Sequence, residues 1–272
     1  MSQDAVKTLA EMTWEEAEQV FDSELTVALL PVGATEQHGH HLPLYTDTIM
    51  VEEVCRRLAA RADDLIVAPA IPFGTSHNHI NFRGTINLSL DTLKAVIVEV
   101  GAELVRNGAD IVLIVNGHGG NTQAVAAAAY DLRQKCPQAV VAQVMWATMI
   151  SEAWSVLDES ISWHADESET SLMLELAPQF VQMERAVDDP PKSLPFFEFT
   201  EEALASTKVD LGLPRTDAVT PSGTIGYATL GTREKGQAIV SEALETMAKV
   251  IRDLRASYAT LAPALSPVDQ VE

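Results

Sequence analysis

The fold is indicated first by an apolar run, Leu25-Thr26-Val27-Ala28-Leu29-Leu30-Pro31-Val32-Gly33. The run is partly β-branched and ends at a glycine, which is the pattern of a buried strand that enters a turn. A second run, Ile111-Val112-Leu113-Ile114-Val115-Asn116, also leads into a glycine-rich turn. Both runs are therefore expected to form strands inside the protein.

Working outward from these runs, strands are expected near residues 25–30, 65–68, 111–116 and 140–145. Helical patterns alternate with them near residues 13–21, 48–62, 91–107, 122–135, 170–177 and 234–257. This alternation predicts an α/β fold with a mostly parallel sheet covered by helices on both faces. The interval 178–222 is irregular and rich in proline and aromatic residues, and such long connections tend to be lids or oligomer contacts.

The twelve residues from Glu36 to Asp47 contain three of the seven histidines, flanked by two carboxylates. They follow the first expected strand, so they should lie at its carboxyl end, where open α/β sheets place their sites. Imidazole and carboxylate ligands together suit Zn, Mn or Fe(II), and one carboxylate can bridge two ions. A histidine-rich surface loop is the alternative, which so many groups of one chemical kind in a strand-to-helix connection disfavour.

The second glycine-rich turn, Asn116-Gly117-His118-Gly119-Gly120-Asn121, carries another histidine. Its glycines allow close approach of a ligand to the backbone, so one interpretation is an anion-binding turn at the head of the helix 122–135. The turn has no lysine and no G-x-x-x-x-G-K-[ST] pattern, which disfavours a nucleotide-binding loop. The repeated order of strand, turn and histidine favours a metal role for His118.

These motifs resemble those of the creatininase family, also called creatinine amidohydrolases, whose members include formamide deformylases and hydrolases of inositol-derived ketones. The resemblance spans residues 10–255, and the matching motifs are Leu30–Pro43, Thr46-Asp47, Asn116–Asn121, Glu169-Thr170-Ser171 and Gly223–Gly226. It implies a three-layer αβα sandwich and a hydrolase that binds two divalent metal ions per subunit. It also implies a homo-oligomer, usually a hexamer of paired subunits.

Carried over position by position, the resemblance implies that Asp47 bridges the two ions and that the ligands include Glu36, His38, Asp47 and His118. Creatininase proper has a glutamate two residues after the histidine of the second motif, where this chain has Gly120. The family's other source of a ligand is the Glu-Thr-Ser motif, which makes Glu169 the fifth candidate.

Glu169 has an alternative role, because Asp166-Glu167-Ser168-Glu169 fits a capping box at the start of the helix 170–177. Charge balance favours the ligand role: Glu36, Asp47 and Glu169 supply three negative charges against four positive charges, and a bridging hydroxide would neutralise the remainder. His164 falls where the family has its catalytic histidine. The alternative for His164 is a solvent-exposed loop residue.

Candidate substrate-binding residues come from three loops and one aromatic position. The loop after the second strand, residues 74–85, should open on the same sheet edge as the metal ligands. The alternative for this loop is a polar loop that does not bind substrate. Residues 221–226 could also approach a substrate, and the alternative for them is a plain turn. Trp146, with Trp154 and Trp163, could form an apolar wall, although core packing is the alternative for each. The candidates are His79, Arg83, Gly119, Trp146 and Gly223.

The mechanism expected from the resemblance begins with a metal-bridging hydroxide that attacks a carbonyl. His164 would carry the proton to the leaving group, while one ion and a loop donor would stabilise the oxyanion. Hydrolysis of an amide C–N bond, in a cyclic amide or a formamide, is the first interpretation. The alternatives are C–C hydrolysis of a cyclic polyol diketone such as 3-dehydro-scyllo-inosose, and a metal-binding structural protein without turnover. Gly119 stands where creatininase proper has a tyrosine, which makes creatinine itself a doubtful substrate.

Length and composition agree with one enzyme domain. The 272 residues are 47% hydrophobic, enough for a full core, and we expect one domain over residues 1–262 with a flexible tail at 263–272. The net charge of −21 disfavours nucleic acids and anionic membranes as partners and leaves a small molecule as the expected partner. No signal peptide or membrane span is evident, so a cytoplasmic location is expected, with Cys55 and Cys136 as reduced thiols.

Overall fold

The computed structural model describes residues 8–61, 65–158, 163–192 and 214–265. Its centre is a four-stranded sheet in which every neighbouring pair is parallel and the strand order is β2-β1-β3-β4. The strands are β1 (Val27–Val32), β2 (Leu65–Val67), β3 (Ile111–Asn116) and β4 (Val140–Met145). A separate antiparallel pair joins β5 (Asp188–Asp189) to β6 (Gly226–Tyr227).

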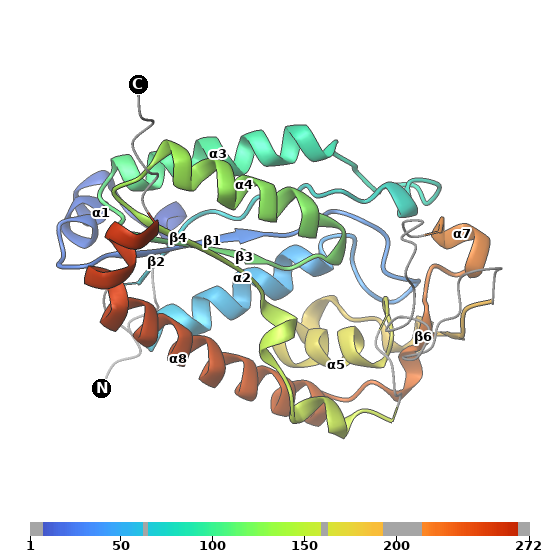
Figure 1. The fold of residues 1–272 in the computed structure, drawn as a ribbon. Helices are drawn as coiled ribbons and strands as arrows, with labels where there is room; N and C mark the ends of the chain where they lie inside the picture. The colour runs from blue at the N-terminus through green and yellow to red at the C-terminus, as the bar shows by residue number, and fades with distance from the viewer. Residues whose placement is uncertain (1–7, 62–64, 159–162, 193–213, 266–272) are drawn as a thin grey trace.

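Helices cover both faces of the sheet (Figure 1). One face carries α3 (Leu90–Arg106) and α4 (Thr122–Lys135), and the other carries α2 (Thr46–Ala59), α5 (Glu167–Leu176) and α8 (Arg233–Leu265). The remaining α-helices of the described residues are α1 (Trp14–Phe21) and α7 (Thr216–Val219). Short 3-10 helices are η1 (Leu9–Glu11), η2 (His77–His79), η3 (Gly119–Asn121), η4 (Trp146–Met149), η5 (Ala153–Val156), η6 (Pro178–Phe180), η7 (Met183–Arg185) and η8 (Ala228–Leu230).

The sheet separates two hydrophobic cores. Val27 and Leu29 of β1 pack with α2, α5 and α8, whereas Ala28 and Leu30 pack with α3 and α4. Every residue of β1 and β3 is buried, because side chains alternate between two covered faces. This explains why the two strands have continuous apolar sequences, and it confirms the predicted three-layer αβα architecture with a mostly parallel sheet.

Two helix boundaries differ from the prediction in ways that matter. α2 begins at Thr46 rather than near residue 48, so Asp47 lies in its first turn, where a carboxylate is favoured by the helix dipole. α8 continues to Leu265 with Pro263 inside it, so residues 263–265 of the expected tail are helical. Residues 266–272 lie outside the described part, as does the 193–213 portion of the irregular interval 178–222.

The topology brings the two ligand motifs together. β1 and β3 are neighbours in the sheet, and Val32 pairs with Asn116 at their carboxyl ends. The loops that follow these strands therefore start side by side at one edge.

Cys55 and Cys136 are both buried and free. No helix in the described ranges is long and apolar enough to cross a bilayer.

Candidate metal and catalytic site

The five predicted metal ligands converge at the carboxyl edge of the sheet. In the described residues, three groups have candidate donor atoms within 4.8 Å of one another: Glu36, Asp47 and His118; His38, Asp47 and Glu169; and Glu36, His38 and His164. The first two groups contain all five predicted ligands, and Asp47 is the residue that they share. The third group makes His164 a further candidate ligand. Each group offers the imidazole nitrogen and carboxylate oxygens that suit Zn, Mn or Fe(II).

Asp47 faces the first two groups from the start of α2. Its Oδ1 lies 3.2 Å from His38 Nε2, and its Oδ2 lies 3.1 Å from His118 Nδ1. The carboxylate is 2% exposed. Its two oxygens therefore point towards different histidines, as a bridging carboxylate requires.

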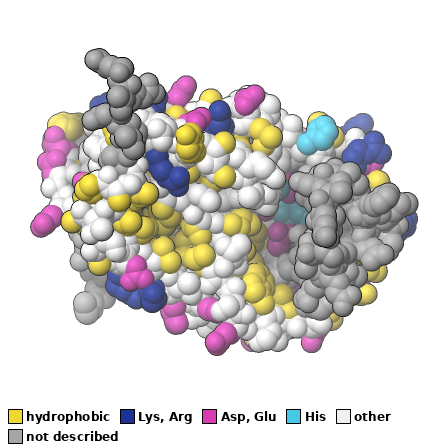
Figure 2. Space-filling model, in the orientation of Figure 1, with side chains coloured by type: hydrophobic (Ala, Val, Ile, Leu, Met, Phe, Trp, Pro, Cys, Tyr) yellow, Lys and Arg dark blue, Asp and Glu magenta, His cyan; other side chains and the backbone are white. Residues whose placement is uncertain are grey.

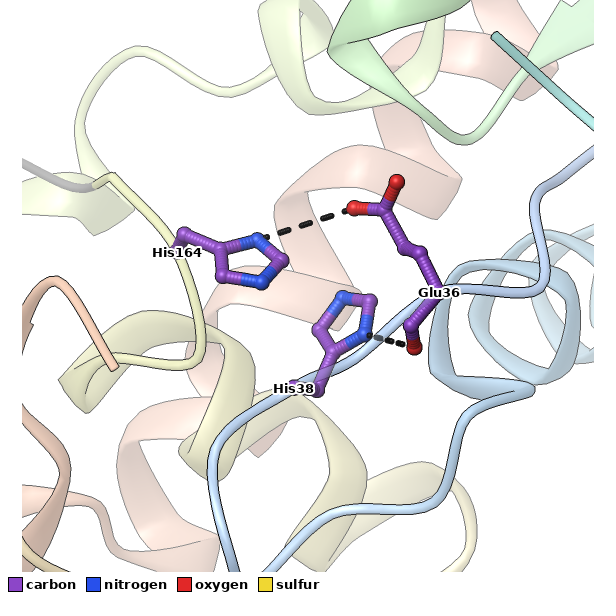
Figure 3. Close-up of side chains that lie close together, drawn as sticks. All are labelled: Glu36, His38 and His164. Atoms are coloured by element: carbon purple, nitrogen blue, oxygen red, sulfur yellow. Dashed lines mark hydrogen bonds and ion pairs between the residues drawn. The ribbon is translucent and has the colours of Figure 1, made fainter. Parts of the chain in front are cut away.

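Glu36 is fully buried, and neither carboxylate oxygen has a hydrogen-bond partner in the described part of the chain. Three histidine rings point towards it instead. Its Oε2 lies 3.3 Å from His118 Nε2, and its Oε1 lies 3.4 Å from His79 Nε2 and 3.8 Å from His164 Nδ1. Figure 3 shows the His164 ring directed at this carboxylate, with His38 anchored through Nδ1 to the Glu36 carbonyl oxygen at 3.1 Å. A buried carboxylate without hydrogen-bond donors is expected where a cation binds.

Glu169 combines part of the capping role with a place in the cluster. Asp166 is the N-cap of α5, as the capping interpretation expects, and accepts hydrogen bonds from the Ser168 and Glu169 amides. Glu169 Oε2 accepts from the Ala165 amide at 2.5 Å rather than from the Asp166 amide. The same oxygen lies 3.6 Å from His38 Nε2, so the cap holds Glu169 against the second group.

Gly120 leaves no room for a side chain beside His118. A Cβ at this position would lie 2.3 Å from the Thr75 carbonyl oxygen and 2.4 Å from His118 Nε2. No side chain fits there without moving backbone or the candidate ligand. The turn after β3 therefore offers one candidate ligand, His118, while Glu169 of α5 lies in the His38 group.

The charges of the cluster are strongly coupled. Burial alone would lower the pKa of His38, but Asp47 and Glu169 raise it to about 10. Burial would also lower the pKa of His118, but Glu36 and Asp47 raise it to about 9. Burial raises the pKa of Glu36 and, with the nearby charges of Asp47 and Asp166, raises the pKa of Glu169 to about 8. His38 and His118 lower the pKa of Asp47 against the effect of burial. The cluster thus attracts positive charge.

Two further histidines lie beside the cluster and behave differently. Burial lowers the pKa of His79 to about 3, helped by the charges of His38 and His118. Burial also holds the pKa of His164 well below its usual range, helped by His79 and His38. His164 lies in the loop before α5 and pairs through its backbone with Ile225. The lowered pKa values leave both rings neutral near pH 7. A neutral imidazole can accept a proton as a general base through one ring nitrogen and donate a hydrogen bond through the other.

A cavity of about 420 Å³ opens over the cluster. Figure 2 shows histidine and acidic side chains together at a recess in the surface, with hydrophobic side chains beside them. Its apolar wall includes the predicted Trp146, Trp154 and Trp163, and none of its described lining residues is Lys or Arg. The wall also contains residues not anticipated from the sequence: Met50, Met145, Leu172, Val219 and Ile225.

The structure separates the candidate substrate-binding residues. His79, Gly119 and Trp146 line the cavity. The Arg83 side chain is exposed and does not line the cavity. Gly223 does not line the cavity, and its carbonyl oxygen accepts a hydrogen bond from Gln37 Nε2 at 3.1 Å. Neither Arg83 nor Gly223 is thus placed to touch a molecule in this cavity.

Gln37 is one of the polar residues of the site that sequence reasoning missed. It is buried, and its amide nitrogen lies 2.8 Å from both His79 Nδ1 and His164 Nε2. Thr216, also missed, places Oγ1 3.1 Å from His79 Nδ1. The position of Gln37 between two candidate ligands, Glu36 and His38, was a usable signal, whereas Thr216 comes from a distant, irregular part of the chain.

Comparison with known proteins agrees with this geometry. The family model for creatininase, described as creatinine amidohydrolase, matches residues 10–251. The chain belongs to the creatininase family. Its relatives are hydrolases, and this chain is a hydrolase of the same family with a cluster able to bind metal.

Three relatives indicate the range of chemistry. A creatinine amidohydrolase from Pseudomonas putida is 31% identical over 265 residues, covering 90% of this chain and 96% of the relative. A mycofactocin precursor peptide peptidase from Mycolicibacterium smegmatis is 33% identical over 242 residues, covering 85% and 86%. A 3-dehydro-scyllo-inosose hydrolase from Thermotoga maritima is 28% identical over 245 residues, covering 83% and 76%.

Solved creatininases share the fold. A structure described as creatininase Mn has a TM-score of 0.78 and 28% identity, covering 91% of this chain and 98% of that one. A creatininase variant described as Zn-Zn type has the same score, identity and coverage. These neighbours hold metals of the kinds that the cluster suits.

Proposed function

We propose that the protein hydrolyses an amide C–N bond with two divalent metal ions held by Glu36, His38, Asp47, His118 and Glu169. The observation that carries the proposal is the shared position of Asp47, whose two oxygens face two separate ligand groups. Divalent cations bound there would lower the pKa of water towards neutrality and polarise a carbonyl oxygen. Zn, Mn and Fe(II) all fit the nitrogen and oxygen donors.

The chain's own residues supply positioning and proton transfer. His164 is buried beside Glu36 and lines the cavity, so it can take a proton from water and return it to the leaving nitrogen. Glu169 serves as a ligand and, through its carboxylate, as a second group able to hold a proton. The tryptophan and methionine wall would orient the apolar part of a substrate.

The wall also favours an amide over a polyol. A cyclic polyol diketone carries many hydroxyl groups that need hydrogen-bond partners once water is excluded. Beside the cluster the cavity presents Met50, Met145 and Trp146, and apolar side chains make up most of its wall, although Asn78, Thr148 and Thr216 also line it. Two of the compared relatives are named for amide or peptide bonds, and one for inosose. C–C hydrolysis of 3-dehydro-scyllo-inosose remains the alternative substrate chemistry for the same site.

Two further proposals rest on the family resemblance. We propose a homo-oligomer, with a hexamer as the expected form, and a cytoplasmic setting. Light scattering coupled to size-exclusion chromatography tests the first, and a monomer at micromolar concentration would contradict it. Cell fractionation tests the second.

The function is tested by metal analysis followed by a substrate panel on the same preparation. We expect two divalent ions per chain and turnover of at least one member of a panel of cyclic amides, formamides and short peptides. A reproducible maximum of one ion per chain would contradict the dinuclear site. Turnover of an inosose with no amide cleaved would replace the amide proposal with C–C hydrolysis, and full metal content without any turnover would favour a structural protein.

A further inference from the structure

One carboxylate, that of Glu242 on α8, binds the segment between β4 and α5. Its Oε1 accepts hydrogen bonds from the Ser151 amide at 2.9 Å, the Ser151 hydroxyl at 2.8 Å and the Glu152 amide at 3.1 Å. Its Oε2 accepts from the Ala153 amide at 2.6 Å. Three consecutive backbone amides thus donate to one side chain that is 89–91 residues away in sequence.

This arrangement requires a carboxylate, because all four partners of Glu242 are donors. A carboxylate has only acceptor sites, about four of them, so it can satisfy all four donors at once. A glutamine of the same shape would place its NH2 group against at least one of them. The amides of Ala153, Glu152 and Ser151 lower the pKa of Glu242 to about 2, so the group is ionised near pH 7.

The same segment is bound to α8 at its other end. Lys235, about two helical turns before Glu242, donates to Asp158 Oδ2 at 2.7 Å and to the buried Glu167 carboxylate. Glu167 in turn accepts from the Asp158 amide at 2.9 and 3.0 Å. Residues seven apart lie on one face of a helix. One face of α8 therefore holds both ends of residues 151–158, and Figure 1 shows this yellow-green segment beside α8.

Trp154 lies between these two points of attachment and lines the cavity. It directly follows Ala153, whose amide donates to Glu242, and it packs against the hydrophobic core on the α8 side of the sheet. The preceding Ser151 and Glu152 are exposed, so they have little packing of their own to fix them. The hydrogen bonds to Glu242 therefore constrain the backbone that presents the indole.

We propose that Glu242 is a positioning residue that fixes Trp154 in the cavity wall and thereby sets the affinity for the apolar part of the substrate. Glu242 itself lies outside the described cavity lining, so it acts through the indole. A wall residue that is already ordered loses less freedom when a substrate packs on it, which favours binding. The effect on affinity rests on the proposed amide hydrolysis, whereas the placement of Trp154 rests on geometry alone.

The first test is hydrogen–deuterium exchange of the full-length metal-loaded protein without substrate, read by mass spectrometry on peptides that cover residues 150–157. Glu242→Gln should raise exchange of the 151–153 amides roughly 10–100-fold, the size expected when hydrogen bonds to a charged acceptor are lost. The control is Glu245→Gln, the same change of charge at an exposed position one turn later on α8, and it should leave exchange unchanged. Unchanged exchange at 151–153 in Glu242→Gln would overturn the positioning role.

The second test follows the indole itself. The chain has four tryptophans, so the signal of Trp154 is the difference between each protein and its Trp154→Phe variant. Acrylamide should quench the fluorescence of Trp154 more strongly in Glu242→Gln than in the wild type or in Glu245→Gln. Equal quenching in the three proteins would show that Glu242 does not fix Trp154.

The third test is kinetic and uses an amide that the wild type cleaves. Glu242→Gln should raise KM roughly 2–10-fold, the size expected when one more side chain must be ordered on binding, and leave kcat and metal content unchanged. In a Trp154→Ala background, Glu242→Gln should have no further effect on KM, because the residue through which it acts is gone. Additive effects in the double variant would overturn the proposed route through Trp154. A lower melting temperature with an unchanged KM would reduce Glu242 to a purely structural role.

Glu242→Asp keeps the charge and the acceptor atoms but is one methylene shorter. It should show the same changes as Glu242→Gln at smaller size, and it replaces that variant if Glu242→Gln does not fold. No change in exchange, quenching or KM in Glu242→Asp would then contradict the proposal. If the wild type cleaves no amide, the proposed function is contradicted, and exchange and quenching still decide whether Glu242 holds Trp154.

Discussion

Asp47 lies within reach of His38 and His118 at once, so the two ligand groups share one carboxylate. Glu169 approaches only the His38 group. These positions give the two acidic residues different expected effects on metal binding, even though both are candidate ligands with one negative charge.

Asp47→Asn should weaken binding of both ions, whereas Glu169→Gln should weaken one ion much more than the other. Each loss should exceed the roughly 10–100-fold that accompanies removal of a partner behind a ligand. Competition with a metal-sensitive dye measures both affinities. Equal losses at both sites in Glu169→Gln would contradict the assigned geometry.

His164 is assigned to proton transfer rather than to metal binding. His164→Ala should keep two ions and lower kcat by roughly 10²–10⁴-fold, because a positioned acid–base group is removed. Metal content, kcat and a melting curve on one preparation measure the effect. His77→Ala is the control, since His77 is exposed on the neighbouring loop and outside the cavity lining. Unchanged kcat at full metal content would remove His164 from the mechanism and direct attention to His79.

At the scale of elements, the turn between β3 and α4 carries a single candidate ligand, His118, which is closely packed. Gly120 has the Thr75 carbonyl and the His118 ring against the position of a Cβ, whereas a Cβ at Gly119 would have nothing within 4 Å. The two adjacent glycines therefore differ in what they do: Gly120 permits close packing, and Gly119 leaves the cavity open.

Gly120→Ala should displace His118, lower metal content and reduce the melting temperature of the metal-loaded protein. Overpacking of this kind typically costs about 1–3 kcal/mol. Gly119→Ala is a matched control one residue away and should retain both ions and stability. Metal analysis and thermal unfolding measure both variants, and equal behaviour of the two would contradict the packing argument.

At the scale of the whole molecule, the metal-free protein should use protons in place of cations. The pKa of His38 rises from 6.5 to about 10, that of His118 from 6.5 to about 9, and that of Glu169 from 4.5 to about 8. Each group binds its proton more tightly in the folded than in the unfolded state. This stabilisation is complete below the unfolded pKa values and is lost as the pH rises through the folded values.

The melting temperature of the metal-free protein should therefore fall between pH 6.5 and pH 9, and metal should restore it. The gap between metal-loaded and metal-free protein should widen as the pH rises, because protons leave the cluster and ligands become available. Calorimetry across this range measures the gap, and metal-free His38→Gln should show a shallower fall. A metal-free melting temperature that stays constant or rises would contradict the prediction.

The sequence by itself determined the order and type of the elements and indicated most of the candidate ligands. Continuous apolar runs at 27–32 and 111–116 are buried because both faces of a parallel sheet are covered, and this requirement is visible in composition alone. The ligand motifs were equally visible, since His38, Asp47 and His118 follow strand ends or begin a helix. Helix ends were less visible, as Thr46 and Leu265 show, because packing extends a helix beyond its local pattern.

Only the tertiary structure decided which polar groups meet. Gln37, His79, His164 and Thr216 come from four separate segments, and nothing local to any of them indicates that one amide nitrogen contacts two rings. The same holds for Arg83 and Gly223, which loop membership suggested as cavity residues and which folding places outside it. Hydrogen-bond direction and cavity access depend on distances between chain segments remote in sequence, and those distances arise only when the sheet and its covering helices are packed.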